Sequence, residues 1–280
     1  MRDRVTVGVD IGGTKMLLVT ARGGGRGMER VATGPETSPR EIEEAVRGFV
    51  ARLDELPAVI GIAVPGLVDG DRRVVACDVL PRLAGWRAAD AFAGLGIPVR
   101  VLNDAEAALV EEAHDLPSGS TAALVMAGTA VGAAFRVHGI PLRGARGWAG
   151  ELGYLPIATG DGVRRLDELA GGASIAARVG TDGAGLRRRA DDGDADALAA
   201  IRRGGEALGL GLAGVVNLFN PGLLVLGGGA LDLPGYESAA IESAESHSLP
   251  ELWRACTVRR VRAGEAVAAL GAARAASAAV

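Results

Sequence analysis

The segment Asp10-Ile11-Gly12-Gly13-Thr14-Lys15 carries residue types that together suit phosphate binding. Adjacent glycines let a backbone turn approach a ligand, take a positive φ and present N–H groups to phosphate oxygens. Thr14 and Lys15 add a hydroxyl and a cation, and Asp10 is suited to hold a hydrated magnesium ion. The segment is not a Walker loop, which has four residues between its glycines and leads into a helix. A bare hairpin turn is the alternative interpretation.

Asn103-Asp104 ends a predicted strand and begins a predicted helix. Asn and Asp are common helix N-caps, so capping alone would account for both residues. The functional interpretation places Asp104 at a cleft between two domains, where its carboxylate accepts the proton of a substrate hydroxyl. The sequence leaves both interpretations open.

A strand, a Gly-Thr turn and a second strand occur twice, at residues 5–19 and 122–137. Gly128 and Thr129 form the turn of the second copy. Two halves that begin in the same way predict a duplicated α/β domain with a cleft between the copies.

A Pro/Gly/Ser-rich linker at 116–120 sets the expected domain boundary. We expect a small N-terminal α/β domain over 1–118, joined by a C-terminal helix at 264–280, and a larger C-terminal domain over 119–263.

Hydrophobic periodicity and end signals predict the individual elements. Ser38-Pro39-Arg40-Glu41 is a capping box with proline at the first helical position. Gly23-Gly24-Gly25 is interpreted as a surface hairpin loop. Strands are expected at 5–9, 16–19, 28–33, 59–64, 98–102, 122–126, 131–137 and 223–226, and helices at 39–53, 105–113, 194–218 and from 265.

The composition excludes several classes of protein. The chain of 280 residues is 49% hydrophobic with a net charge of -4, which argues against disorder and against general nucleic-acid binding. Aromatic residues make up 3%, too few for base-stacking platforms. The N-terminus lacks a signal peptide and the apolar run 207–219 is shorter than a membrane span of about 20 residues, so we expect a cytoplasmic protein. Cys77 and Cys256 are interpreted as ordinary thiols.

Two motif-like segments are interpreted as structural. Gly209 to Gly214 matches the dinucleotide-binding pattern but lies within a predicted helix, where glycines favour helix packing. Asp191 to Asp196 has no register that fits a calcium loop, so it is interpreted as a solvated connection. The histidines His114, His138 and His247 are scattered and form no metal pair.

Five segments, in order, resemble motifs of the ROK family (repressors, uncharacterised frames and sugar kinases), within the actin-like and hexokinase-like ATPases. They are Val7 to Lys15, similar to the first phosphate motif; Gly61 to Asp69, similar to the strand and Pro-Gly turn; Leu80 to Glu112, similar to the sugar-binding and catalytic-aspartate segment; Gly144 to Gly153, similar to the Gly-Glu sugar motif; and Asn217 to Gly229, similar to the adenosine-binding segment. The resemblance implies two actin-like, ribonuclease H-like domains with an interdomain cleft.

The chain departs from the family pattern at three positions. Family members usually carry a histidine that ligates a structural zinc with three downstream cysteines, but Tyr154 stands at that place and 155–170 contains no cysteine. We therefore expect no structural zinc. Asp167 replaces a sugar-binding glutamate, and Ala130 replaces a glycine of the second phosphate turn, where a β-carbon could crowd the phosphates. Because the sugar-facing wall is altered, glucose is not the default acceptor.

The resemblance implies an ATP-dependent kinase that transfers the γ-phosphate to a hydroxymethyl oxygen of a hexose-type sugar. The acceptor could be glucose-like, an aminosugar such as kanosamine, or a C7 cyclitol, and polyphosphate is an alternative donor. The alternative function is a ROK protein that binds a sugar or nucleotide without catalysis. A DNA-binding repressor would carry a helix-turn-helix before the first strand, where this sequence has four residues. We expect a homodimer that binds no nucleic acid and no membrane.

The resemblance also implies the role of each residue. Asp104 is the implied catalytic base. The implied substrate contacts are Asn103, Asp104, Glu151, Tyr154 and Asp167; the implied nucleotide contacts are Asp10, Gly12, Gly13, Thr14, Lys15, Gly128, Thr129, Gly227, Gly228 and Gly229; and Asp10 holds Mg²⁺ through water.

Overall fold

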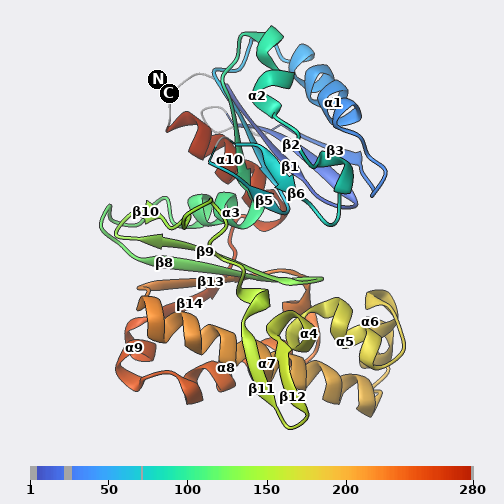
Figure 1. Cartoon of the computed structure of the whole chain (residues 1–280), viewed down its shortest axis with the longest axis vertical. Coiled ribbons are helices and arrows are strands. Elements are labelled where there is room, and N and C mark those ends of the chain that lie inside the picture. Colours follow the sequence, from blue (N-terminus) through green and yellow to red (C-terminus); the bar gives the residue numbers. More distant parts are fainter. Residues whose placement is uncertain (1–4, 22–26, 71, 279–280) are drawn as a thin grey trace. The chain divides into compact units, whose positions relative to one another are not determined.

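The computed structural model describes residues 5–21, 27–70 and 72–278. The loop predicted at Gly23-Gly24-Gly25 lies outside these residues, as do the last two positions of the predicted C-terminal helix. The chain forms two compact units (Figure 1). Unit 1 comprises Met1–Leu116, Arg143–Ala149 and Arg262–Val280, and unit 2 comprises Pro117–Leu142 and Gly150–Val261.

Unit 1 is built on a five-stranded sheet in the order β3-β2-β1-β4-β7. Strands β1, β2 and β3 are antiparallel neighbours, whereas β1, β4 and β7 run parallel. The strands are β1 (Thr6–Ile11), β2 (Lys15–Ala21), β3 (Met28–Ala32), β4 (Ile60–Val64) and β7 (Val99–Asn103), with a separate pair β5 (Leu67–Val68) and β6 (Val74–Ala76). The helices are α1 (Pro39–Ala51), α2 (Ala88–Ala91), α3 (Asp104–Glu112) and α10 (Val267–Ser277), with 3-10 turns η1 (Pro81–Leu83), η2 (Ala93–Leu95) and η5 (Gly264–Ala266).

Helices α1 and α10 cover opposite faces of this sheet (Figure 1). The alternate residues Val7, Val9 and Ile11 of β1 are fully buried in the cluster that includes α1. On the other face, Gly8 and Gly61 allow the backbone of α10 to approach, because a Cβ at either position would lie 2.0 Å from a carbonyl oxygen of α10. Ser38 caps α1 in the predicted capping box, which is confirmed.

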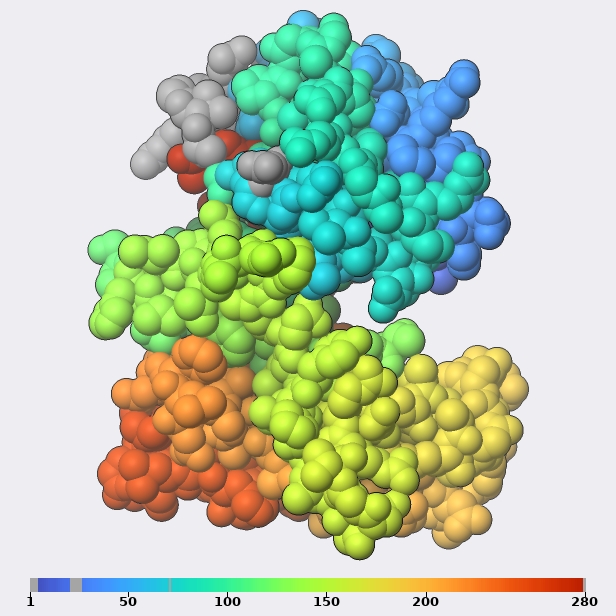
Figure 2. Space-filling view, in the orientation of Figure 1, coloured from blue at the N-terminus to red at the C-terminus, as the bar shows by residue number. Residues whose placement is uncertain are grey.

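Unit 2 is built on a second five-stranded sheet in the order β10-β9-β8-β13-β14. Its strands are β8 (Ala122–Ala127), β9 (Val131–Val137), β10 (Ile140–Pro141), β13 (Leu223–Gly227) and β14 (Thr257–Arg260), with a separate hairpin of β11 (Pro156–Thr159) and β12 (Gly162–Arg165). The helices are α4 (Leu166–Ala170), α5 (Gly172–Arg178), α6 (Gly183–Asp191), α7 (Ala195–Phe219), α8 (Tyr236–His247) and α9 (Pro250–Ala255), with 3-10 turns η3 (Leu152–Tyr154) and η4 (Gly229–Asp232). All residues of β12 are exposed, and the hairpin forms part of the surface in Figure 2.

Both sheets begin with an antiparallel hairpin whose first strand also pairs with a parallel strand, β4 in unit 1 and β13 in unit 2. This repetition confirms the duplicated α/β arrangement predicted from the sequence. Two of the α7 glycines serve helix packing as predicted: a Cβ on Gly209 would lie 2.5 Å from the Ala240 carbonyl oxygen of α8, and one on Gly211 would lie 2.6 Å from Leu166 of α4. The prediction is wrong for Gly214, where a Cβ would meet no atom within 4 Å. No helix in the described part of the chain is long and apolar enough to cross a membrane.

Candidate active site

Asp10 and Asp104 lie at the same edge of the sheet of unit 1. Asp10 is near the end of β1, and Asp104 is the first residue of α3, directly after β7. Both strands run parallel to β4, which lies between them, so their carboxyl ends share one edge. In open α/β sheets this edge is where ligands bind.

The pKa of the Asp10 carboxyl group at this edge is far above the usual value for an aspartate. Burial and the negative charge of Asp104 raise the pKa of Asp10 to about 7, although Lys15 partly opposes the shift. Two carboxylates that resist simultaneous ionisation are typical of catalytic and metal-binding sites.

The surroundings of Asp10 fit a hydrated magnesium ion. Among the described residues, no group of three or more His, Cys, Asp or Glu side chains could hold a metal ion. Magnesium does not need such a group, because it keeps several waters and uses one or two carboxylates together with substrate phosphates. Burial is the main reason that the pKa of Asp10 is raised, and a divalent cation beside the carboxylate would favour its charged form.

The turn from Gly12 to Lys15 joins β1 to β2. The Gly12 N–H donates to the Lys15 carbonyl at 2.9 Å, and the Thr33 hydroxyl donates to the Gly12 carbonyl at 2.6 Å. The expected positive φ is wrong, since neither Gly12 nor Gly13 has one. Limited space favours glycine at both positions instead. A Cβ at Gly12 would lie 2.9 Å from the Lys15 carbonyl oxygen, and a Cβ at Gly13 would lie 3.0 Å from Cβ of Val79, which would have to shift.

Lys15 is held by a residue that the sequence did not single out. Its ammonium group forms an ion pair with Glu265 in η5, at 2.7 Å, and Arg30 of β3 binds the other carboxylate oxygen. These hydrogen bonds, first from Arg30 and then from Lys15, lower the pKa of Glu265 to about 2. No local pattern could have linked Glu265 to a turn 250 residues earlier.

Asn103 is the N-cap of α3, as the capping interpretation predicts. Its side-chain oxygen accepts hydrogen bonds from the backbone N–H groups of Ala105 and Glu106. Its amide nitrogen donates to the Gly66 carbonyl at 3.0 Å. An amide carries two N–H donors, so one donor of Asn103 has no partner among the described residues and could bind a ligand.

In unit 2, the turn of Gly128, Thr129 and Ala130 is packed against the junction of α4 and α5. The Gly172 N–H donates to the Gly128 carbonyl at 2.8 Å. A Cβ on Gly171 would lie 2.8 Å from the Thr129 carbonyl oxygen. Thr129 and Ala130 are themselves exposed, so the turn presents its outer side to solvent.

Asp167 of α4 holds the end of the same turn. Its Oδ1 accepts a hydrogen bond of 2.6 Å from the Val131 N–H, the first residue of β9. Gly153 lies against this carboxylate, because a Cβ there would be 2.4 Å from the carboxyl carbon. Asp167 therefore connects Gly153 to the end of the turn of Gly128, Thr129 and Ala130.

Glu151 and Tyr154 flank Gly153 at the two ends of η3, and both are exposed. Tyr154 is 57% exposed, and the Arg165 guanidinium lies 4.9 Å from the centroid of its ring. A cation over the ring fixes the orientation of a side chain that is otherwise open to solvent.

Gly227, Gly228 and Gly229 follow β13. A Cβ on Gly227 would lie 2.5 Å from the Met126 sulfur, and Gly228 has φ +96° with a virtual Cβ 2.3 Å from the Ala127 carbonyl oxygen. Position 228 therefore requires glycine, because its φ is positive and because a side chain there would collide with the backbone of β8. Gly229 has open space around its Cα, which leaves the backbone accessible at that point.

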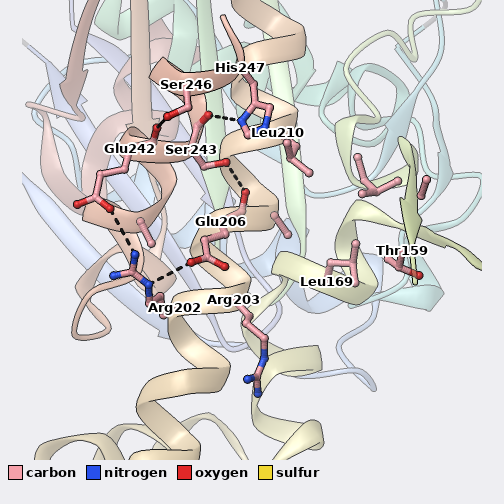
Figure 3. Close-up of a pocket in the computed structure, with 14 residues that line it drawn as sticks. Thr159, Leu169, Arg202, Arg203, Glu206, Leu210, Glu242, Ser243, Ser246 and His247 are labelled. Carbon is pink, nitrogen blue, oxygen red and sulfur yellow. Dashed lines mark hydrogen bonds and ion pairs between the residues drawn. The ribbon is translucent and has the colours of Figure 1, made fainter. Parts of the chain in front are cut away.

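A separate cavity of about 540 Å³ lies between α7, α8 and β11 in unit 2 (Figure 3). Arg202 bonds Glu206 at 3.1 Å and approaches Glu242 at 3.6 Å, while His247 contacts the Ser243 carbonyl at 2.7 Å. None of the site residues predicted from the sequence lines this cavity.

Comparison with known proteins supports the sequence resemblance. The sequence model of the ROK family matches residues 6–279. An N-acetyl-D-glucosamine kinase of Erwinia tasmaniensis is 30% identical over 297 residues, covering 95% of this chain and 97% of that protein. A ROK hexokinase from Thermus thermophilus is 30% identical with a TM-score of 0.83, covering 98% of both chains. A ROK family glucokinase from Streptomyces griseus, in complex with glucose and AMPPNP, shares the fold at 24% identity and a TM-score of 0.78, covering 98% of this chain and 99% of that one.

Proposed function

The chain belongs to the ROK family and is a sugar kinase, and we propose that it transfers the γ-phosphoryl group of ATP to a hydroxymethyl oxygen of a hexose-type sugar. The observation that carries this proposal is the pair of carboxylates at one sheet edge, Asp10 and Asp104, beside a glycine turn with a lysine. Phosphoryl transfer needs little covalent chemistry from a protein, so charge and positioning dominate.

Asp104 is the proposed general base. It is the first residue of α3, a helix start that holds a carboxylate in place, and its Oδ1 accepts the Ala105 N–H at 2.8 Å. A carboxylate in this position accepts the hydroxyl proton and directs the oxygen toward the phosphorus.

Asp10, the Gly12–Lys15 turn and the Gly128–Thr129 turn are the proposed phosphate contacts. Backbone N–H groups, Thr hydroxyls and the Lys15 ammonium group bind phosphate oxygens. Asp10 would hold Mg²⁺ through water, and the ion would supply positive charge next to the phosphates. Gly227 to Gly229 are proposed to contact adenosine, with Gly229 the most accessible of the three.

The proposed acceptor contacts are Asn103, Glu151, Tyr154 and Asp167. Asn103 has one remaining N–H donor, and Asp167 uses Oδ1 for Val131, which leaves Oδ2 for a hydroxyl. Tyr154 and Asp167 depart from the family pattern, so we propose an acceptor other than plain glucose: an aminosugar, such as an N-acetylated hexosamine or kanosamine, or a C7 cyclitol. We also propose a cytoplasmic location. We further propose a homodimer, and light scattering of the purified protein would measure its molar mass.

The test is ADP release with ATP or polyphosphate as donor across a panel of hexoses, aminosugars and cyclitols. We expect one acceptor class to give turnover, and Asp104→Asn to lower its kcat by about 10²–10⁴-fold, the range for a lost general base. Asp54→Asn, an exposed aspartate of unit 1, is the matched control and keeps full activity.

Two results would contradict the proposal. Unchanged turnover in Asp104→Asn removes the base assignment. Saturable sugar binding without turnover for any acceptor indicates a non-catalytic binding protein, which Ala130 in the second phosphate turn would favour.

A further inference from the structure

A small cavity of about 40 Å³ lies in unit 1, between the connection from β5 to β6 and the end of β7. Its polar lining consists of Asp69, Arg72, Asn103, Glu106 and Arg143. The volume holds about three water molecules, since one water needs roughly 10–15 Å³ of this measure. A sugar ring does not fit, but a single carboxylate or phosphate group does.

The two carboxylates of this cavity are already paired. Glu106 accepts hydrogen bonds from the Arg143 guanidinium, with Nε to Oε1 at 3.1 Å. Asp69 accepts from both the backbone and the side chain of Arg73, at 2.9 and 3.1 Å.

Two further arginines lack a carboxylate partner in the described part of the chain. The Arg72 guanidinium forms no hydrogen bond or ion pair with the described residues, although the residue is half-buried. Its backbone N–H donates to the Asp69 carbonyl at 2.9 Å. Arg100 donates to the Ala275 carbonyl at 2.9 Å, but its Nε is fully buried without a partner. The surroundings of the cavity therefore carry an excess of positive charge.

The arginines also repel one another. Burial first, and then the charge of Arg143, lower the pKa of Arg72, although Glu106 partly opposes this. Burial, Arg72 and Arg143 likewise lower the pKa of Arg100. Half-buried guanidinium groups that repel one another are stabilised when an anion binds between them.

We propose that this cavity binds a small oxyanion, a carboxylate or a phosphate group, through Arg72 and Arg143. The group has two sources. It is either a free ion such as inorganic phosphate, or a substituent of a larger molecule whose remainder lies outside the cavity. Asn103 lines the cavity and also caps α3, so bound anion lies next to a proposed acceptor contact. The inference does not depend on kinase activity.

The test is calorimetric titration of the whole protein with inorganic phosphate at constant ionic strength. Saturating Mg·ADP is present so that the proposed nucleotide phosphate site is filled. Arg72→Gln should raise the dissociation constant for phosphate about 10- to 100-fold, which corresponds to the loss of a hydrogen bond to a charged group. Arg40→Gln is the matched control, because it removes an exposed arginine of α1 that is paired with Glu44. The control should bind phosphate as the parent does.

A second measurement guards against misfolding of the variant. Without anion, Arg72→Gln should melt at the same temperature as the parent or higher, because a half-buried unpaired charge has been removed. Phosphate should then raise the melting temperature of the parent and of Arg40→Gln but not of Arg72→Gln. Arg72→Lys keeps the charge and should retain part of the binding.

The two sources are separated by the choice of probe. Tighter binding of glucuronate than of phosphate or glucose, lost in Arg72→Gln, identifies a carboxylate carried by a sugar. Phosphate binding without any preference for glucuronate identifies a free ion. No binding of either probe, or equal losses in Arg72→Gln and Arg40→Gln, overturns the proposal. Such a result leaves the kinase assignment intact, since the assay measures no turnover.

Discussion

The ammonium group of Lys15 lies 2.7 Å from a carboxylate oxygen of Glu265, and the two side chains are 51% and 40% exposed. The only lysine of the chain, in the turn proposed to bind phosphate, is thus paired with a residue just before the C-terminal helix α10. A phosphate that binds Lys15 must compete with this carboxylate.

Glu265→Gln is therefore expected to lower the KM for ATP, by up to about fivefold, with little change in kcat. The limit follows from the modest strength of exposed ion pairs. Steady-state kinetics at low ionic strength provide the measurement. Glu29→Gln is the control, because Glu29 is 39% exposed and paired with Arg52 away from the turn. A KM that rises in Glu265→Gln would show that Glu265 orients Lys15 rather than competing for it. An equal shift of KM in both variants would show that the effect is not specific to Glu265.

Amine-directed labelling provides a direct probe of Lys15, since the chain offers one lysine and the N-terminal amine. ATP with Mg²⁺ should slow labelling of Lys15 and leave the N-terminal amine unaffected. Mass spectrometry of the labelled peptides measures both rates in one sample. Equal labelling of Lys15 with and without ATP would refute its phosphate contact.

The raised pKa of Asp10 predicts a dependence of stability on pH. The folded state holds the proton up to about pH 7, whereas the unfolded carboxyl group loses it near 3.8. The free energy of unfolding therefore falls as pH rises between these values, because the charged form is disfavoured only in the folded state. Asp10→Asn removes this effect, so its melting temperature should exceed that of the parent increasingly from pH 4 to pH 7 and by a constant margin above.

In free energy of unfolding, the difference between Asp10→Asn and the parent is a few kcal/mol at most, since one pKa unit corresponds to about 1.4 kcal/mol. The same variant should lose activity if Asp10 holds magnesium. A margin that does not change with pH would mean that Asp10 is ionised at ordinary pKa in the folded protein.

Gly153→Ala tests the contact between η3 and Asp167. The new Cβ would lie 2.4 Å from the carboxyl carbon, so the carboxylate must move away from the Val131 N–H. We expect a loss of about 1–3 kcal/mol in the free energy of unfolding, the usual cost of overpacking. Gly160→Ala is the control, because no atom lies within 4 Å of its added Cβ.

A double variant makes this test specific. Asp167→Ala removes the carboxylate that Gly153→Ala would displace. The double variant should therefore lose less free energy of unfolding than the sum of the losses in the two single variants. Strict additivity in denaturant unfolding would show that the two residues act independently.

The sequence by itself determined the features that depend on short windows of residues. The capping box at Ser38, the N-cap at Asn103 and the long helix α7 follow from local backbone preferences, and each lies where the pattern predicts it. The short helices α4, α5 and α6 did not appear in the prediction, because five to nine residues give little periodicity to detect.

Only the tertiary structure decided which distant residues meet. The order of strands in the sheet brings Asp10 and Asp104 to one edge, the packing of the C-terminal segment brings Glu265 to Lys15, and the fold of unit 1 gathers Arg72, Arg100 and Arg143. Local sequence encodes backbone conformation and residue chemistry. The contacts between residues far apart in the chain depend on how complete elements pack, and no short window contains that information.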